Sequence, residues 1–229
     1  TYPMLDGRGL AVRDIQTVAD EMRSLRDRFG ADVFFIVDSV FNADPRRPRM
    51  LAEELLRRKL NIRWSAFFTP KGISAEDAAV MKESGLEGAE LGVESLSDKT
   101  LDAYGKSFNA EDAIAAAKAC ADADLPYLVY LIFGGPGETP ETLRETVERA
   151  GELPRAVFTV FVGMRIYPGT QLERLALRRG IIAQGESLLQ PRFYLSPDLP
   201  PETLEEITGE LARRPNWLVA GKSMEPREK

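Results

Sequence analysis

The residues that could do chemistry in this chain follow five apolar stretches, each at the point where the stretch ends. These polar and glycine-rich segments are Asp38-Ser39, Thr69 to Lys71, Glu94-Ser95, Gly134 to Glu138, and Arg165 to Thr170. Carboxylates, cationic side chains and accessible backbone groups of this kind can bind a polar cofactor or a divalent metal ion. Either Asp38 or Glu94 alone could simply cap a helix. Five such segments together favour a shared ligand over five independent caps.

The sharpest of these segments is Gly134-Gly135-Pro136-Gly137-Glu138, which follows the apolar run from Tyr130 to Phe133. Its glycines tolerate positive φ angles and let a ligand approach the backbone closely. Thr139 and Pro140 then have the types preferred at the cap and the first position of a helix. The segment does not match a phosphate-binding loop, and no Gly-x-Gly-x-x-Gly turn follows the first apolar stretch.

The composition excludes several kinds of site. The 229 residues include no histidine and one cysteine, so the chain by itself cannot build a disulfide, a thiolate zinc site or a four-cysteine cluster. The alanine-rich helix predicted around Cys120 places Ile114 and Ala117 on one face, and we interpret Cys120 as a buried structural thiol. The net charge of -6 argues against a nucleic-acid surface. No apolar run reaches the roughly 20 residues of a membrane span and no signal peptide is evident, which predicts a cytoplasmic protein.

The elements that must position these segments alternate along the chain. The five apolar stretches predict strands at 32–37, 62–68, 88–93, 126–133 and 157–162, and amphipathic helices are predicted between them. Such alternation predicts an α/β fold with a parallel sheet and right-handed crossovers. Stretch 32–37 is apolar on both faces, which is typical of a strand covered on both sides. The carboxyl ends of parallel strands share one edge, so the five segments should meet there.

Two other functions are compatible with these residues. Asp38, Glu94 and Glu138 could bind Mg²⁺ through carboxylate oxygens, as in a metal-dependent barrel lyase or hydrolase. A barrel of this kind could also be a non-catalytic docking module for another subunit.

Six short motifs, in this order, resemble those of the radical S-adenosylmethionine (SAM) enzymes, and within them the type that follows a cobalamin-binding domain. The motifs are Tyr-Pro-x-Leu-x-Gly-Arg at 2–8, Val-Asp-Ser-Val-Phe at 37–41, Gly-Val-Glu-Ser at 92–95, Tyr-Gly-Lys-Ser-Phe at 104–108, Gly-Gly-Pro-Gly-Glu-Thr at 134–139 and Tyr-Pro-Gly-Thr at 167–170. The resemblance implies a parallel, TIM-like partial (β/α)6 barrel that lacks its first strand, over residues 1–182. Residues 183–229 would form a C-terminal extension of a loop, a helix and a frayed tail.

The resemblance also implies which residues bind SAM. Asp38 would meet the amino group, Glu94 and Ser95 the ribose, and Lys106 the carboxylate. The adenine would be bound by Phe133, Gly135, Met164 and Arg165, while Glu138 ties the glycine turn to its neighbours.

In this family a Cys-x-x-x-Cys-x-x-Cys motif holds a [4Fe–4S] cluster, and by the resemblance it would come just before Thr1. We therefore expect no metal ligands within this chain, and expect the fragment alone to be inactive. The full protein would cleave SAM to a 5′-deoxyadenosyl radical that abstracts hydrogen from a small-molecule substrate, for methyl transfer or ring formation. Its expected partners are that substrate and an upstream cobalamin-binding domain in the same polypeptide. Arg192, Tyr194 and Trp217 are candidates for the substrate side, although surface packing explains them equally well.

Overall fold

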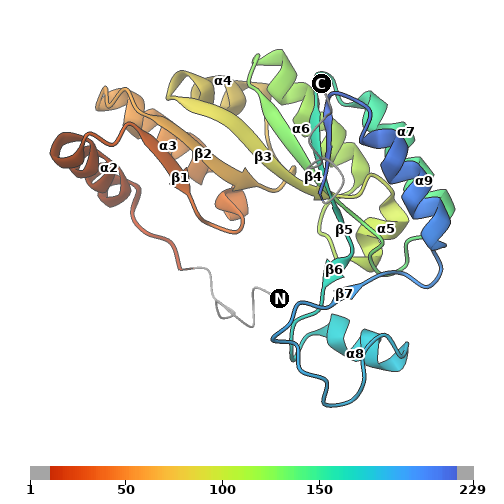
Figure 1. The fold of residues 1–229 in the computed structure, drawn as a ribbon. Coiled ribbons are helices and arrows are strands. Elements are labelled where there is room, and N and C mark those ends of the chain that lie inside the picture. The colour runs from red at the N-terminus through yellow and green to blue at the C-terminus, as the bar shows by residue number, and fades with distance from the viewer. Residues whose placement is uncertain (1–10, 221–229) are drawn as a thin grey trace, which may run out of the picture.

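The fold is seen in a computed structural model that describes residues 11–220 (Figure 1). The motif predicted at residues 2–8 and the tail beyond residue 220 lie outside the described residues.

A six-stranded parallel sheet in the order β1-β2-β3-β4-β5-β8 forms the centre of the molecule. Its strands are β1 (Val33–Ile36), β2 (Arg63–Phe68), β3 (Leu86–Glu94), β4 (Tyr127–Phe133), β5 (Val157–Val162) and β8 (Trp217–Val219). The first five confirm the predicted strands. β1 and β8 are the two edges and do not pair with each other, so the described strands form an open, barrel-like sheet rather than a closed barrel. The α/β fold class is confirmed.

The helices lie on one side of the sheet, with the exception of α8 (Gln171–Arg178), which lies apart from it (Figure 1). They are α2 (Ile15–Phe29), α3 (Arg47–Arg57), α4 (Ala75–Glu83), α5 (Asp98–Ala103), α6 (Ala110–Asp122), α7 (Pro140–Arg149), α8 (Gln171–Arg178) and α9 (Pro201–Leu211). Local sequence accounts for their starts: Thr139 and Asn109 each form a capping box at the first turn of α7 and α6. No helix between residues 11 and 220 has the length and apolar character needed to cross a bilayer.

Only one face of the sheet is fully buried. Along β4, alternate residues from Tyr127 to Phe133 are buried on the helix side, while Tyr130 and its neighbours on the other face are partly exposed. The expectation that stretch 32–37 is covered on both faces is wrong, because Phe35 on β1 remains 45% exposed. A strand that is apolar on both faces is therefore not necessarily covered by other elements on both faces.

The C-terminal segment contributes to the sheet. β8 lies within the predicted extension and was not predicted as a strand, yet it pairs in parallel with β5, and the Trp217 ring stacks on Phe158 at 4.2 Å between centroids. Tyr194 is buried in a small cluster with Ile166 and Ala176. Trp217 and Tyr194 are thus packing residues rather than substrate contacts.

Arg192 also makes its contacts within the C-terminal segment. Its guanidinium pairs with Glu186 at 3.2 Å and donates to the Ile181 carbonyl. The backbone around it joins two short antiparallel strands, β6 (Met164–Arg165) and β7 (Phe193–Tyr194). These contacts favour the packing interpretation of Arg192.

Candidate functional site

The carboxyl ends of the six strands share one edge of the sheet, and we call this edge the rim. At the rim the Lys106 Nζ lies 2.6 Å from Glu94 Oε1, and each side chain is 24% exposed. Glu94 ends β3 in a left-handed conformation with φ of +69°, at a shift in the β3–β4 register. A non-glycine residue in this region is uncommon and is found preferentially at functional positions. The structure therefore brings a carboxylate and an ammonium group together at the rim, where both are partly accessible.

The loop that carries Lys106 is held from two sides. The Lys106 amide donates to the Leu101 carbonyl at 3.0 Å, and Lys71, at the end of β2, donates from Nζ to the Ser107 carbonyl at 3.0 Å. This hydrogen bond holds the Lys106 loop against the segment that contains Lys71. This contact joins the rim segments that follow β2 and β3.

Asn42 makes the corresponding link between the segments that follow β1 and β2. Its side-chain amide donates to the Thr69 carbonyl at 2.8 Å, and its oxygen accepts from the Thr69 amide at 2.8 Å. Asn42 is 5% exposed. Sequence reasoning missed this residue, since an asparagine in a loop carries no signal of a partner 27 positions away.

Glu138 braces the glycine turn from inside. Its side chain is fully buried, and Oε2 accepts a hydrogen bond from the Gly134 amide. The other oxygen, Oε1, is buried without a hydrogen-bond partner among the described residues. Because burial penalises the charged form, the pKa of Glu138 is raised to about 7. This geometry matches the predicted role of tying the turn to its neighbours.

The loop before α9 is hydrogen-bonded to the glycine turn through Ser196. The Ser196 hydroxyl donates to the Glu138 carbonyl at 2.8 Å, and the Ser196 amide donates to the Gly134 carbonyl at 2.8 Å. Ser196 was not predicted as a site residue. Both of its partners are about 60 positions away, so only the folded chain reveals the contact.

The Tyr104 side chain leaves no room for a side chain at position 135. A Cβ atom at Gly135 would lie 2.1 Å from the Tyr104 Oη. The Tyr104 hydroxyl donates to the Ile132 carbonyl at 3.2 Å, and burial raises the pKa of this phenol well above its usual range. Tyr104 lies within the motif that suggested Lys106, but its contact with the glycine turn could not be predicted from that motif.

The other residues predicted to bind SAM differ in how far they are buried. Ser95 and Phe133 are fully buried, and the Ser95 hydroxyl is hydrogen-bonded to Thr146 Oγ1 at 2.9 Å. Asp38 is exposed beyond the end of β1. Met164 is partly exposed on β6, and the Arg165 guanidinium carbon lies 4.8 Å from the centroid of the Tyr167 ring.

The structure gives no support to the magnesium alternative. In the part of the chain that the structure describes, no group of three His, Cys, Asp or Glu side chains is arranged to hold a metal ion. Glu94 is paired with Lys106, and Glu138 is hydrogen-bonded to the glycine turn.

Cys120 is buried in α6, and burial raises the pKa of its thiol to about 12, which confirms its structural role. Residues 11–220 thus supply no ligand set for a [4Fe–4S] cluster.

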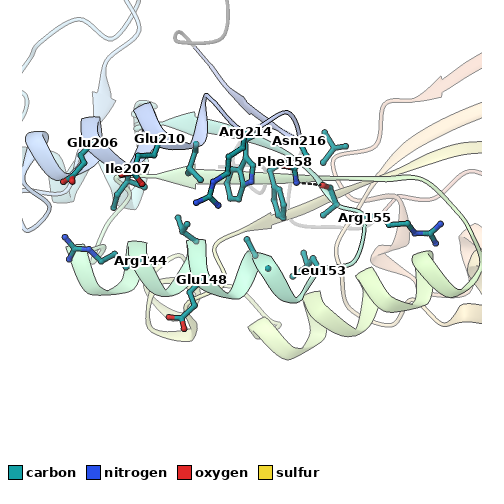
Figure 2. Close-up of a pocket in the computed structure, with 17 residues that line it drawn as sticks. Arg144, Glu148, Leu153, Arg155, Phe158, Glu206, Ile207, Glu210, Arg214 and Asn216 are labelled. Atoms are coloured by element: carbon teal, nitrogen blue, oxygen red, sulfur yellow. Dashed lines mark hydrogen bonds between the residues drawn. The ribbon is translucent and has the colours of Figure 1, made fainter.

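A cavity of about 940 Å³ lies between α7 and α9 (Figure 2). Figure 2 shows charged side chains, among them Arg144, Glu148 and Arg214, around an apolar floor that includes Phe158. The strand residues that line it stand at the amino ends of β5 and β8. This cavity is therefore at the opposite end of the sheet from the rim, where parallel α/β folds do not place their chemistry.

Comparison with known proteins identifies a family and several relatives. A family model described as the radical SAM superfamily matches residues 5–150. An uncharacterized methyltransferase of Pyrococcus horikoshii is 27% identical over 170 residues, covering 73% of this chain and 36% of that protein. The tryptophan 2-C-methyltransferase of Streptomyces laurentii is 27% identical over 180 residues, covering 72% and 30% respectively. The chain spans about a third of the length of these curated relatives.

The fold also resembles a solved structure, that of the radical S-adenosylmethionine methyltransferase TsrM from Kitasatospora setae with cobalamin and a [4Fe–4S] cluster bound. The TM-score is 0.75 at 21% sequence identity, with 95% of this chain and 49% of that chain covered. At this identity the likeness is one of fold.

Proposed function

Because this chain belongs to the radical SAM superfamily, we propose that its rim binds SAM and that it is the SAM-binding core of a cobalamin-dependent methyltransferase. The observation that carries the proposal is the Glu94–Lys106 pair, which stands partly exposed on the same rim as Asp38 and the glycine turn.

The charges of the rim fit the amino-acid end of SAM. The Lys106 ammonium can bind the SAM carboxylate, and the exposed Asp38 carboxylate can bind its amino group, both through charge-assisted hydrogen bonds. Glu94 can accept hydrogen bonds from the ribose hydroxyls. In the free protein Lys106 and Glu94 neutralise each other, so SAM would replace one ion pair by two contacts of its own.

The glycine turn fits the adenine end. Gly134 and Gly135 are buried, against the Leu195 side chain and the Tyr104 phenol respectively, and Gly137 is the exposed glycine of the turn. We assign Met164 and Arg165 the open side of the adenine. The Phe133 side chain is fully buried on the helix side of β4, so Phe133 would support the turn rather than touch the adenine. Ser95, whose hydroxyl is bonded to Thr146, would act by holding the backbone of Glu94 rather than by touching the ribose.

Members of this superfamily use a [4Fe–4S] cluster that supplies the electron for SAM cleavage. No ligand set for it lies in residues 11–220, so the part of the chemistry assigned to this chain is to bind and orient SAM and to exclude water from it. The methyltransferase relatives support methyl transfer to a small molecule. The cobalamin-bound structural neighbour supports a cobalamin-binding domain in the same polypeptide. The proposal includes action of the whole protein in the cytoplasm.

The binding part of the proposal can be tested on the chain itself. Saturation-transfer NMR and calorimetry with SAM should show binding that Lys106→Ala and Glu94→Ala each weaken about tenfold or more. Lys118→Ala, at an exposed position on α6, serves as the matched control and should bind SAM like the parent. Absence of SAM binding, or binding that ignores both rim substitutions, would refute the assignment.

The reaction requires the longer protein. After anaerobic reconstitution of the cluster and addition of cobalamin, SAM with a deuterated methyl group should yield a product three mass units heavier than the one made with ordinary SAM. SAM consumption without methyl transfer to any product would restrict the proposal to SAM binding.

A further inference from the structure

Four aromatic rings form a continuous row across the exposed face of the sheet. The ring centroids of Phe35 and Phe67 are 5.1 Å apart, those of Phe67 and Tyr130 5.9 Å, and those of Tyr130 and Phe161 6.1 Å. We call these four residues the inner aromatic row. They come from β1, β2, β4 and β5, so the sheet itself fixes their spacing.

The row is accessible. The helices that connect the strands lie on the other side of the sheet (Figure 1), and Phe35 and Phe161, at the two ends of the row, are each 45% exposed. Other apolar side chains on the same face, such as Val157 and Leu218, are also exposed. The Phe67 and Tyr130 rings between them are partly exposed. The Tyr130 and Phe161 rings are nearly parallel, with an interplanar angle of 17°, whereas Phe35 meets Phe67 edge to face at 85°. The row therefore offers an apolar aromatic surface with one pair of near-parallel rings on which a planar ligand can pack.

β3 supplies a single charge between the rings. Glu90 lies next to Phe67 in the strand register, and its Oε2 accepts a hydrogen bond of 2.7 Å from the Tyr130 hydroxyl. Burial, reinforced by Glu90, raises the pKa of Tyr130 to about 12, so the phenol keeps its proton and orients the carboxylate at neutral pH.

Glu90 has no cation to neutralise it. Within residues 11–220 no lysine or arginine reaches it, and its second oxygen, Oε1, makes no hydrogen bond. Two cations of the same sheet region have carboxylate partners of their own: Lys106 pairs with Glu94 at the rim, and Arg63 pairs with Asp32 at the amino end of β2. A partly exposed carboxylate, fixed by a phenol and flanked by aromatic faces, is complementary to a cation.

We propose that the inner aromatic row and Glu90 form the substrate site, and that the substrate class is a planar, apolar ring system bearing a protonated amine. The ring packs on the row, and the ammonium group donates to Glu90 Oε1. The proposal rests on the proposed function in one respect, namely that a SAM-dependent reaction at the rim acts on what this face holds. The negative faces of the aromatic rings and the carboxylate both disfavour an anionic ligand.

The test uses three probes that share one ring: 1-naphthylmethylamine, 1-naphthalenemethanol and 1-naphthoic acid. Titrated into the 229-residue chain at pH 7, the amine should bind about tenfold tighter than the alcohol, and the acid more weakly than both. Glu90→Gln should abolish the preference for the amine and leave the affinity for the alcohol unchanged. Glu206→Gln, an exposed carboxylate on α9, is the matched control and should preserve the preference.

Two further variants keep the result interpretable. Phe67→Leu should weaken all three probes by a similar factor, since it removes ring contact and no charge. Tyr130→Phe retains the ring but frees Glu90, and should reduce the preference for the amine even if Glu90→Gln fails to fold. Equal affinity for the three probes, no binding of any of them, or a preference that survives Glu90→Gln would overturn the proposal.

SAM binding measured on the same variants separates the two proposals. Glu90→Gln should leave the SAM affinity unchanged, and Lys106→Ala should leave the preference for the amine unchanged. If the unsubstituted chain prefers the amine but does not bind SAM, the function proposed for the rim is refuted and this site is not. If it binds SAM but shows no preference for the amine, only this site is refuted.

Discussion

The Lys106 ammonium and the Glu94 carboxylate form an ion pair of 2.6 Å that joins two loops of the rim before any ligand is bound. Each group is assigned to a different part of SAM, so the pair must open when SAM binds. The free energy of that opening sets how strongly each substitution affects binding.

This relationship predicts unequal effects on SAM affinity. Lys106→Met should lower the affinity about tenfold, because it removes the contact to the SAM carboxylate and leaves Glu94 unpaired. Glu94→Gln should lower it less, since losing the ribose contact is partly offset by freeing Lys106. Calorimetric titration of both variants checks the order, and a larger loss from Glu94→Gln would contradict it.

The contact between Tyr104 and Gly135 predicts a steric cost. Gly135→Ala should lower the free energy of unfolding by about 1–3 kcal/mol, because the new Cβ would overlap the Tyr104 ring. In a Tyr104→Ala background the same change should cost much less. Gly209→Ala, in the open interior of α9, is the control and should raise stability slightly. Chemical denaturation of the parent and the four variants provides the measurement, and additive effects of Gly135→Ala and Tyr104→Ala would exclude the clash.

Glu138 predicts a pH dependence of stability. Burial raises the pKa of Glu138 in the folded chain to about 7, above its ordinary value of 4.5, so between these pH values the folded chain keeps a proton that the unfolded chain releases. Stability should therefore fall as the pH rises from 4.5 to 7 and then level off, with a total contribution of about 3 kcal/mol. Glu138→Gln should remove this slope, whereas Glu206→Gln should retain it. Urea denaturation at a series of pH values provides the measurement, and an unchanged slope in Glu138→Gln would assign it to other groups.

The Trp217–Phe158 stack predicts that the C-terminal segment is essential to the sheet. Trp217→Ala should cost about 3–5 kcal/mol, because it removes a buried indole that packs at 4.2 Å on the ring of Phe158. Leu189, which is 92% exposed, offers the matched control, and Leu189→Ala should be nearly neutral. Thermal melting of both variants is sufficient, and equal melting temperatures would show that β8 contributes little.

The sequence by itself determined five of the strands and the order of the rim segments. Each strand is an apolar run that ends in a charged or glycine residue, and capping residues such as Thr139 and Asn109 mark the helix starts locally. Parallel βα alternation then requires the strand ends to meet at one edge. The positions of Asp38, Glu94 and Gly135 at that edge follow without coordinates.

Only the tertiary structure decided which of those residues are accessible at the rim and which are buried beneath it. Ser95 and Glu138 have the same polar character as Glu94, but long-range packing buries them, and no local pattern encodes burial. The same applies to β8, whose three residues are too few to show a period until β5 pairs with them. The inner aromatic row is the clearest case. An apolar strand has the same sequence whether helices cover one face or both, so the exposure of Phe35 and Phe161 depends on what packs against the sheet.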